Sequence, residues 1–403
     1  MSKKEKKIVV EEPIRLDIPE DEIWTYQVEG LAAPHINKPY KHYGLKKVIF
    51  AVVIIIAVSI SCYFSVRTVQ KDTFEYEQTQ SGYELSKFSN TGYITTLDID
   101  FASSVEYDEN NPDVNTNFKI VKDETKKVTS VGAYALNCDE RVKIINIGAE
   151  VEFVEPKAFY SCWALQQIEV DENNPNYCDI DGVLYNKDKT RIICRPCDHD
   201  TYLAEKYGHA KYDENGYRIE PAAEDENYEQ YVKDVLTFVV PSTVETVGEL
   251  CFNYANMKNV YLPEGLKAIE TLGFFEIPLL ENVYSYKTDV LIAESHYVSD
   301  AALGEVYLSL PEGLEYIGSD AFSYNQAMNY MFIPESVTYI GHHAFWDTVY
   351  KEGKELRGIS QINVALSEED FKDKVETGNS WRPQYDYMLF KKSIDIAYGA
   401  ERK

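Results

Sequence analysis

Apolar and polar positions along the middle of the chain follow one phrase that recurs with a period of about 22 residues, the length of a short structural repeat. Each copy has an apolar strand, a turn that usually contains Pro, a β-branched pair and a closing step that resembles Ala-Phe. The copies end at Leu136, Phe159, Phe252, Phe274, Phe322 and Phe345, with longer steps before Phe252 and Phe322. Units this short bury their apolar face only by stacking on their neighbours. The period therefore predicts a solenoid in which the closing aromatic residues form one buried row.

The four clearest copies read VPSTVETVGELCF, LPEGLKAIETLGF, LPEGLEYIGSDAF and IPESVTYIGHHAF. This phrase resembles the BspA-type bacterial leucine-rich repeat, and the resemblance covers roughly residues 97–345. It implies a mainly β fold with short helical turns, a leucine-rich repeat solenoid of about 22–23 residue units. Three positions depart from the pattern: Gly273 and Cys251 replace the Ala, and Leu136 replaces the Phe.

The same pattern divides the chain into five parts. Residues 96–350 are expected to form the solenoid, with polar insertions near 199–231 and 287–303 that form loops at its edge. Residues 351–403 resemble the closing segment that caps such arrays. Residues 1–47 mix charge with Pro and lack periodicity, so we expect a disordered cytoplasmic tail. The polar residues 67–95 are expected to form an extracellular stalk.

An uncharged apolar run, Val48 to Val66, precedes the repeats. At about 1.5 Å per residue, a helix over this run spans close to 30 Å, the thickness of a bilayer core. Residues 38–47 hold four lysines, whereas Arg67 and Lys71 follow the run, which favours the N-terminus inside. A cleaved signal peptide is disfavoured because a long charged segment precedes the run and no small-x-small site follows it. The sequence thus predicts one transmembrane helix with the C-terminal domain outside the cell.

The chain is acidic, with 40 basic and 67 acidic residues and a net charge of −27. Such a surface repels phosphate backbones, so nucleic acid is not an expected partner. The charge is explained by solubility and by spacing from an anionic cell wall.

Six cysteines lie outside the predicted membrane helix. Cys138, Cys162 and Cys251 fall at or just after the closing step of a repeat, where a small buried residue is expected. Cys194 and Cys197 are the one close pair, near His199 and His209. A zinc site is disfavoured because there is no second such pair and the histidines lack finger spacing. A disulfide and free thiols both remain open for the pair.

Aromatic residues recur at the central position of the predicted strands. Successive strand residues point to opposite faces, so these central residues form one exposed column. An aromatic column of this kind is a candidate surface for a protein or glycan ligand. The alternative is that the rings stack on neighbouring rungs of the sheet. The candidate ligand-binding residues are Tyr261, Tyr284, Tyr307, Tyr330 and Phe332.

The sequence carries no nucleophile elbow, zinc-protease motif, phosphate loop or dinucleotide fingerprint. We therefore expect no catalytic residue, no metal ligand and no cofactor. The expected function is a non-catalytic binding module. The family resemblance implies adhesion or ligand recognition at the bacterial cell surface, with an extracellular protein or glycan as partner. A cell-envelope sensor, an enzyme accessory protein and a structural spacer are the alternatives.

The membrane prediction is tested by the start of the mature chain. We expect Val48 to Val66 to be retained in protein recovered from membranes, because no cleavage site follows the run. N-terminal sequencing checks this. A mature chain that starts near residue 60 or later would contradict the anchor.

Overall fold

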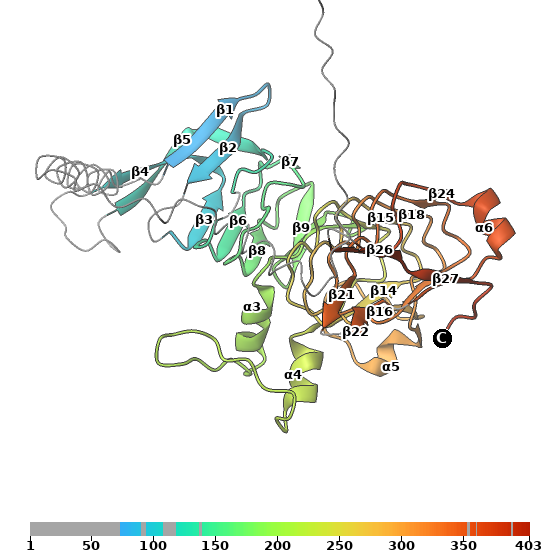
Figure 1. The fold of residues 1–403 in the computed structure, drawn as a ribbon. Coiled ribbons are helices and arrows are strands. Elements are labelled where there is room, and N and C mark those ends of the chain that lie inside the picture. The colour runs from blue at the N-terminus through green and yellow to red at the C-terminus, as the bar shows by residue number, and fades with distance from the viewer. Residues whose placement is uncertain are drawn as a thin grey trace, which may run out of the picture. The chain divides into compact units, whose positions relative to one another are not determined.

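The computed structural model describes residues 73–89, 94–107, 118–136, 139–352, 355–359, 361–387 and 390–403. The predicted tail 1–47 and membrane helix Val48 to Val66 lie outside these residues. Among the described residues, no helix has the length and apolar character needed to span a bilayer. The described part is mainly β, as the repeats predict (Figure 1).

The first repeats carry strands on two sides of a core. On one side three strands form a parallel sheet in the order β3-β6-β8. On the other side a sheet runs β1-β2-β5-β4, and β7 pairs with the end of β5. The bounds are β1 Thr73–Gln78, β2 Tyr83–Ser89, β3 Thr96–Ile99, β4 Phe101–Tyr107, β5 Phe118–Val131, β6 Ile144–Ile147, β7 Phe153–Val154 and β8 Gln167–Val170.

The predicted stalk at residues 67–95 is wrong for residues 73–89. These residues form β1 and β2, which pair antiparallel with each other, and β2 also pairs with β5. Leu85 and Phe88 are buried in the core of the first repeats. Most residues of this strand are polar, and only a few apolar side chains point into the core. The sequence pattern therefore did not indicate a half-buried strand here.

A three-stranded antiparallel meander joins the first repeats to the later ones. Its strands are β9 Tyr177–Ile180, β10 Val183–Asn186 and β11 Arg191–Cys194. Leu184 packs in the core of the first repeats, whereas Val183 and Tyr185 pack in the core of the later ones. The meander therefore closes both cores.

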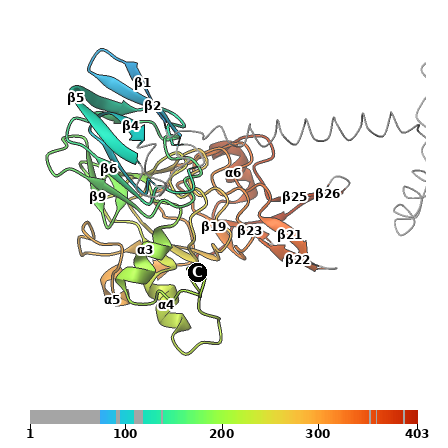
Figure 2. The same cartoon turned by 90° about the vertical axis from the view of Figure 1, so that its left-hand side faces the viewer.

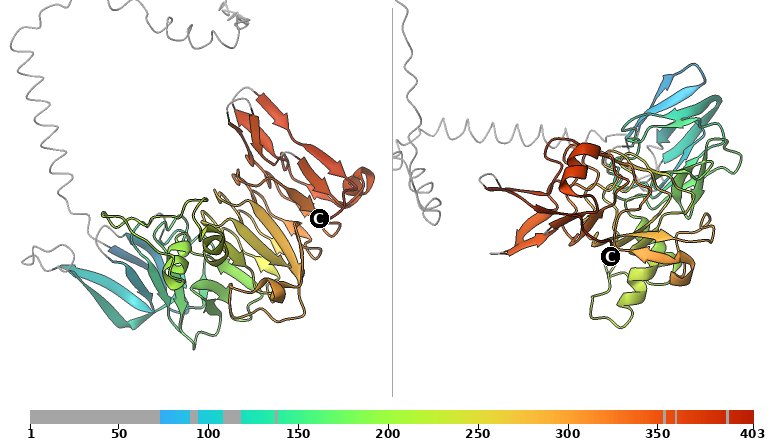
Figure 3. Two further views of the ribbon diagram at one scale, coloured as in Figure 1. Left: turned by 90° about the horizontal axis from the view of Figure 1, so that it is seen from below. Right: turned by 90° about the vertical axis from the view of Figure 1, so that its right-hand side faces the viewer.

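The later repeats again have strands on two sides of one core, and successive rungs follow chain order (Figure 3). One side carries the sheets β12-β14-β16-β17 and β19-β23-β27. Their bounds are β12 Thr237–Val239, β14 Asn259–Pro263, β16 Asn282–Lys287, β17 Glu305–Tyr307, β19 Met331–Ile333, β23 Gln361–Val364 and β27 Asp395–Tyr398. The other side continues β9-β10-β11 through very short strands, namely β13 Thr246–Val247, β15 Ala268–Ile269, β18 Tyr316–Ile317, β20 Tyr339–Ile340 and β24 Glu376–Thr377.

Proline and glycine shape the turns between these sides. The Pro263 carbonyl accepts the Leu266 N–H at 3.0 Å, and the same bond recurs from Leu314 to Pro311 at 3.1 Å. A fixed φ suits proline to the start of such turns. At Gly341 a β-carbon would lie 2.4 Å from the Ser319 backbone nitrogen. Neighbouring repeats thus approach too closely there for any side chain.

The closing aromatic residues form the predicted buried row. Phe252, Phe274, Phe322 and Phe345 are fully buried, with successive ring centroids 4.7, 5.1 and 5.4 Å apart and ring planes within 12° of parallel. This part of the prediction is confirmed. Phe159 is also buried, but it belongs to the separate core of the first repeats.

A ladder of backbone hydrogen bonds runs beside this row. Phe274 N–H donates to the Ala321 carbonyl and Phe322 N–H to the Ala344 carbonyl, both at 2.8 Å. The residues two before and two after each phenylalanine adopt left-handed φ, for example Leu272 at 58° and Glu276 at 50°. Such conformations cost roughly 1–2 kcal/mol each in a non-glycine residue. The bonds from one repeat to the next keep the chain in this geometry.

Both insertions lie on one side of the array, where Figures 1 and 2 show their helices together. Residues 199–231 contain α3 (His199–Lys206) and the start of α4 (Tyr228–Asp234), and α5 (Asp300–Leu303) ends the second insertion. The C-terminal segment adds β23, β24 and β27 to the repeat sheets, and Trp381 packs edge-on to Phe345. Its other elements are α6 Glu368–Lys374 and the hairpins β21 Val349–Glu352 with β22 Glu355–Gly358, and β25 Gln384–Tyr387 with β26 Phe390–Ser393.

Removal of one ring from the row should be costly. Truncation of Phe274 to Ala should lower the free energy of unfolding by about 3–5 kcal/mol, because a core Phe leaves a cavity between two stacked rings. Urea unfolding measures this loss. Phe153, which is 49% exposed, provides the matched control and should lose little on the same change. Equal losses at the two positions would contradict the stacked row.

Candidate functional site

The structure separates the five residues of the predicted column into three environments. Tyr261 and Tyr284 pair in register on β14 and β16, and their rings stack 4.8 Å apart. Both rings are half-buried. This pair confirms that rings stack along the face and still leaves part of each ring open.

Tyr307 and Tyr330 lie under another part of the chain. The Arg402 guanidinium carbon lies 4.0 Å from the Tyr307 ring centroid, and the Lys403 ammonium lies 4.7 Å from that of Tyr330. β17 also runs antiparallel to β16, so Tyr307 faces Ser285 rather than continuing the parallel register. The predicted continuous column therefore breaks after Tyr284.

The prediction that Phe332 is exposed is wrong. Phe332 is only 1% exposed. The Leu310 N–H donates to the Phe332 carbonyl oxygen at 3.2 Å. The backbone around Leu310 therefore lies directly beside Phe332. Alternation along the strand placed Phe332 on the outer face, but other segments of the chain cover that face here.

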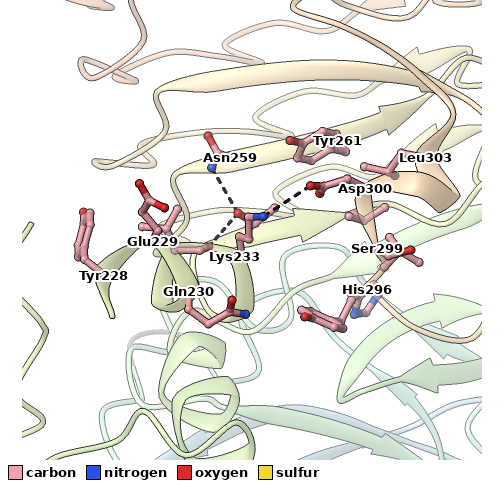
Figure 4. Close-up of a pocket in the computed structure, with 15 residues that line it drawn as sticks. Tyr228, Glu229, Gln230, Lys233, Asn259, Tyr261, His296, Ser299, Asp300 and Leu303 are labelled. Atoms are coloured by element: carbon pink, nitrogen blue, oxygen red, sulfur yellow. Dashed lines mark hydrogen bonds and ion pairs between the residues drawn. The ribbon is translucent and has the colours of Figure 1, made fainter. Parts of the chain in front are cut away.

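A cavity of about 500 Å³ lies over the outer face of β12 and β14 (Figure 4). One wall is helix α4, another is the end of the second insertion, and Tyr261 and Val239 come from the sheet. The lining side chains are Tyr228, Glu229, Gln230, Val232, Lys233, Thr237, Val239, Asn259, Tyr261, His296, Tyr297, Val298, Ser299, Asp300 and Leu303. The structure thus joins Tyr261 to both insertions in one site.

The second insertion is anchored by a small apolar cluster. Ile292 and Leu303 pack with Val239 and Tyr286 from the sheet, and all four are nearly inaccessible to solvent. The Tyr286 hydroxyl donates to the Val240 carbonyl at 2.7 Å. Burial of these side chains fixes the loop on the sheet, so the cavity wall is part of the folded structure.

Helix α4 is held by a second cluster in the first insertion. Tyr231 packs with Leu203, Ala204 and Leu236. Asp234, at the end of α4, accepts hydrogen bonds from His209 Nε2 at 2.7 Å and from Gln230 Nε2 at 2.8 Å. These contacts position the α4 face that forms the cavity wall.

The cavity combines aromatic surface with hydrogen-bonding groups. Asn259 Nδ2 donates to Thr237 Oγ1 at 3.3 Å, and Lys233 lies 3.5 Å from Asp300 across the opening. Lys233 and Asp300 are largely exposed. Burial raises the pKa of Tyr261 to about 12, so its hydroxyl stays protonated and can donate. The arrangement suits a polar ligand that offers hydroxyl or carbonyl groups and one flat face.

A buried polar pair, Tyr185 and His296, borders the cavity, and His296 is one of its lining residues. The Tyr185 hydroxyl and His296 Nε2 are 2.5 Å apart, and the His296 ring lies 4.2 Å from that of Phe238. His296 Nδ1 and His199 Nε2 are buried and have no hydrogen-bond partner among the residues that the structure describes. Burial lowers the pKa of His199 to about 3 and that of His296 well below its usual value. Both rings are therefore neutral in the folded protein.

The described cysteines are not paired with one another. Cys162, Cys178, Cys194, Cys197 and Cys251 are free thiols, so Cys194 and Cys197 are not joined. Burial raises the pKa of Cys197 to about 12, which disfavours the thiolate. Cys138 lies outside the described residues. No group of three His, Cys, Asp or Glu is arranged for a metal ion within the described ranges.

Comparison with known proteins agrees with this architecture. A model of the BspA type leucine rich repeat region matches six copies over residues 84–179 and 226–351. The chain belongs to this repeat family. A search of curated proteins found no match.

Solved structures include other repeat proteins with low identity. A leucine-rich repeat protein from Eubacterium ventriosum is 17% identical, with 70% of this chain and 64% of that one covered and a TM-score of 0.40. The pneumococcal vaccine antigen PcpA is 15% identical, with 68% and 60% covered and a TM-score of 0.38. A repeat protein from Bacteroides ovatus is 15% identical, with 83% and 71% covered and a TM-score of 0.30. The chain thus spans less than two thirds of the first two proteins.

The repeat period alone did not identify the α4 and α5 side chains of the site. Gln230, Lys233 and Asp300 stand in stretches without repeat signal, and their approach to Tyr261 depends on how each insertion folds back. The available signal was the two long steps between closing residues, before Phe252 and before Phe322. These long intervals show where residues are inserted between consecutive BspA-type repeats.

The buried histidines predict acid sensitivity. A histidine whose pKa is lowered by folding binds its proton more readily in the unfolded chain. The associated stability is complete above about pH 6.5 and falls as the pH drops below it, by roughly 1.4 kcal/mol per pH unit for each histidine. Urea unfolding at pH 7 and pH 5 measures this. An H199Q/H296F variant should lose less stability over the same interval, and an identical loss would contradict the assignment.

Proposed function

We propose that this BspA-type repeat protein is a non-catalytic recognition module whose ligand binds in the cavity over β12 and β14. The main support for this proposal is the cavity itself. Two insertions from separate parts of the chain enclose it against the outer face of a repeat sheet. Its volume of about 500 Å³ falls in the range of small-ligand sites, about 300–1,000 Å³.

The lining favours a glycan, or a polar loop of a protein, as the ligand. The open part of the Tyr261 ring offers a flat apolar surface, and its stacking on Tyr284 restricts the ring. Asn259, Gln230 and Lys233 offer donors around this surface. Aromatic anchors give large contact area at low entropy cost, and surrounding polar groups orient the ligand.

We propose a cell-surface location on the sequence alone. The uncharged run Val48 to Val66 supports a single membrane anchor, and the lysines before it support an N-terminus inside. In this arrangement the repeat domain faces outward and recognises an extracellular protein or glycan. Adhesion to a surface is one use of such recognition.

The proposed site is tested by binding to immobilised glycans and matrix proteins. For a ligand found in this way, Tyr261→Ala and Tyr284→Ala should each weaken affinity by about 1–3 kcal/mol, the usual contribution of an aromatic anchor. Tyr134, which is 48% exposed on an earlier repeat, is the matched control and should tolerate the change.

Circular dichroism must show that each variant is folded. A folded Tyr261→Ala variant that binds every ligand as tightly as the parent would contradict the cavity as the binding site.

A further inference from the structure

A second site lies beyond the point where the parallel column breaks, beside the β16–β17 pair. The Arg402 guanidinium is held there from several directions at once. Its Nε donates to Ser309 Oγ at 2.7 Å, and its Nη2 donates to Ser285 Oγ and to Glu264. Its Nη1 lies 3.5 Å from Glu312, and its plane lies over the Tyr307 ring. We call Glu264, Ser285, Tyr307, Ser309 and Glu312 the arginine socket.

The floor of the socket consists of two buried hydroxyl groups, those of Ser285 and Ser309. Ser285 pairs in register with Leu262 of the preceding repeat, so the strand position is one that elsewhere carries a buried aliphatic residue. Ser285 and Ser309 are themselves 0% and 2% exposed, and their hydroxyls lie 3.1 Å apart. Buried hydroxyls need partners, and the Arg402 side chain supplies donors to both.

The rim of the socket is acidic, and a backbone hydrogen bond orients one of its carboxylates. The Glu264 carboxylate accepts the Glu312 N–H at 2.8 Å, which fixes its orientation. Burial raises the pKa of Glu312, the Arg402 charge opposes this rise, and the neighbouring Glu264 and Glu335 charges add to it. Without a cation the rim would hold like charges close together. A guanidinium gives the two buried hydroxyls hydrogen-bond donors and also neutralises the acidic rim. Its planar fork can donate to carboxylates and hydroxyls at the same time.

The segment that occupies the socket has few other bonds. Gly399 and Ala400 N–H groups donate to Leu366 and Val364 carbonyls at 2.9 and 3.0 Å. After Ala400, one backbone bond is found in the described part of the chain, from Leu308 N–H to the Lys403 carbonyl at 2.9 Å. Lys403 adds its contact with the Tyr330 ring. Side chains rather than backbone therefore hold Arg402 and Lys403 in place.

We propose that the arginine socket is a recognition site for a partner protein segment with Arg followed by Lys, and that residues 399–403 of this chain are its resident occupant. The resident segment imitates the ligand: Arg binds over Tyr307, Lys over Tyr330, and one backbone bond forms with Leu308. A partner must displace it, so the resident segment lowers the apparent affinity for competing segments. This site is separate from the cavity over β12 and β14.

The test uses the full chain and a fluorescein-labelled, amidated peptide Gly-Ala-Glu-Arg-Lys. In the parent the tethered segment competes at an effective concentration on the order of millimolar, whereas an R402A/K403A variant has an empty socket. Fluorescence anisotropy should show the variant binding the peptide at least about tenfold more tightly than the parent. The matched control peptide has Ala in place of Arg and should not bind.

A further substitution locates the binding. Addition of E264Q to R402A/K403A should weaken peptide binding by about tenfold or more, because a charge-assisted bond to guanidinium is lost. If R402A/K403A does not fold, R402K/K403A takes its place, because a lysine without the planar fork competes more weakly with the Arg peptide for the socket. The proposal is overturned if the folded variant binds the Arg and Ala peptides equally or binds neither. Retained binding after E264Q would equally overturn it. Neither result bears on glycan or protein binding at Tyr261.

Discussion

The structure depends on one constraint: a single short repeat cannot bury its own apolar face and must share it with the next repeat. Phe252, Phe274, Phe322 and Phe345 express this constraint as a row of stacked rings. Hydrogen bonds from each repeat to the next, such as Phe274 N–H to Ala321, hold the turns in left-handed conformations that single residues disfavour. The same stacking pairs β13, β15, β18 and β20 in parallel register, one short strand for each of these repeats.

A fixed register leaves the outer face of the sheets open for other uses. Over β12 and β14 the insertions cover it, with Leu303 and Ile292 buried against Val239, and a polar and aromatic cavity remains. Farther along, β17 runs antiparallel and the face is interrupted. Near this break Ser285 stands at a position that carries Leu262 in the preceding repeat, Ser309 is buried beside it, and the Arg402 side chain binds both hydroxyls. The regular repeats thus support the two candidate sites. The sites themselves lie where the repeat pattern is interrupted, at the two insertions and at the antiparallel strand β17.

The repeat period predicted the features that recur in every repeat, such as the stacked phenylalanines. It did not predict which segments fold back over the outer face of the sheets. Spacing was enough to foresee that Phe274 and Phe322 stack, because each lies at the same offset in its repeat. Alternation placed Tyr261 and Phe332 on one outer face, but it could not show that other parts of the chain bury Phe332. Strand β2 was missed because its inward side chains, Leu85 and Phe88, stand among polar residues. Ser285 at an aliphatic position was a visible signal of a buried polar site.

The second insertion docks on the repeat sheet and so closes the cavity beside Tyr261. A double-mutant cycle on Val239 and Leu303 tests this most directly, because both are 3% exposed in the same cluster. The free energy of unfolding would be measured for V239A, L303A and the pair. Because the two side chains pack in one cluster, we expect an interaction energy of about 0.5–3 kcal/mol between the two changes. Additivity within about 0.3 kcal/mol would contradict it, since the loop would then not rest on the sheet.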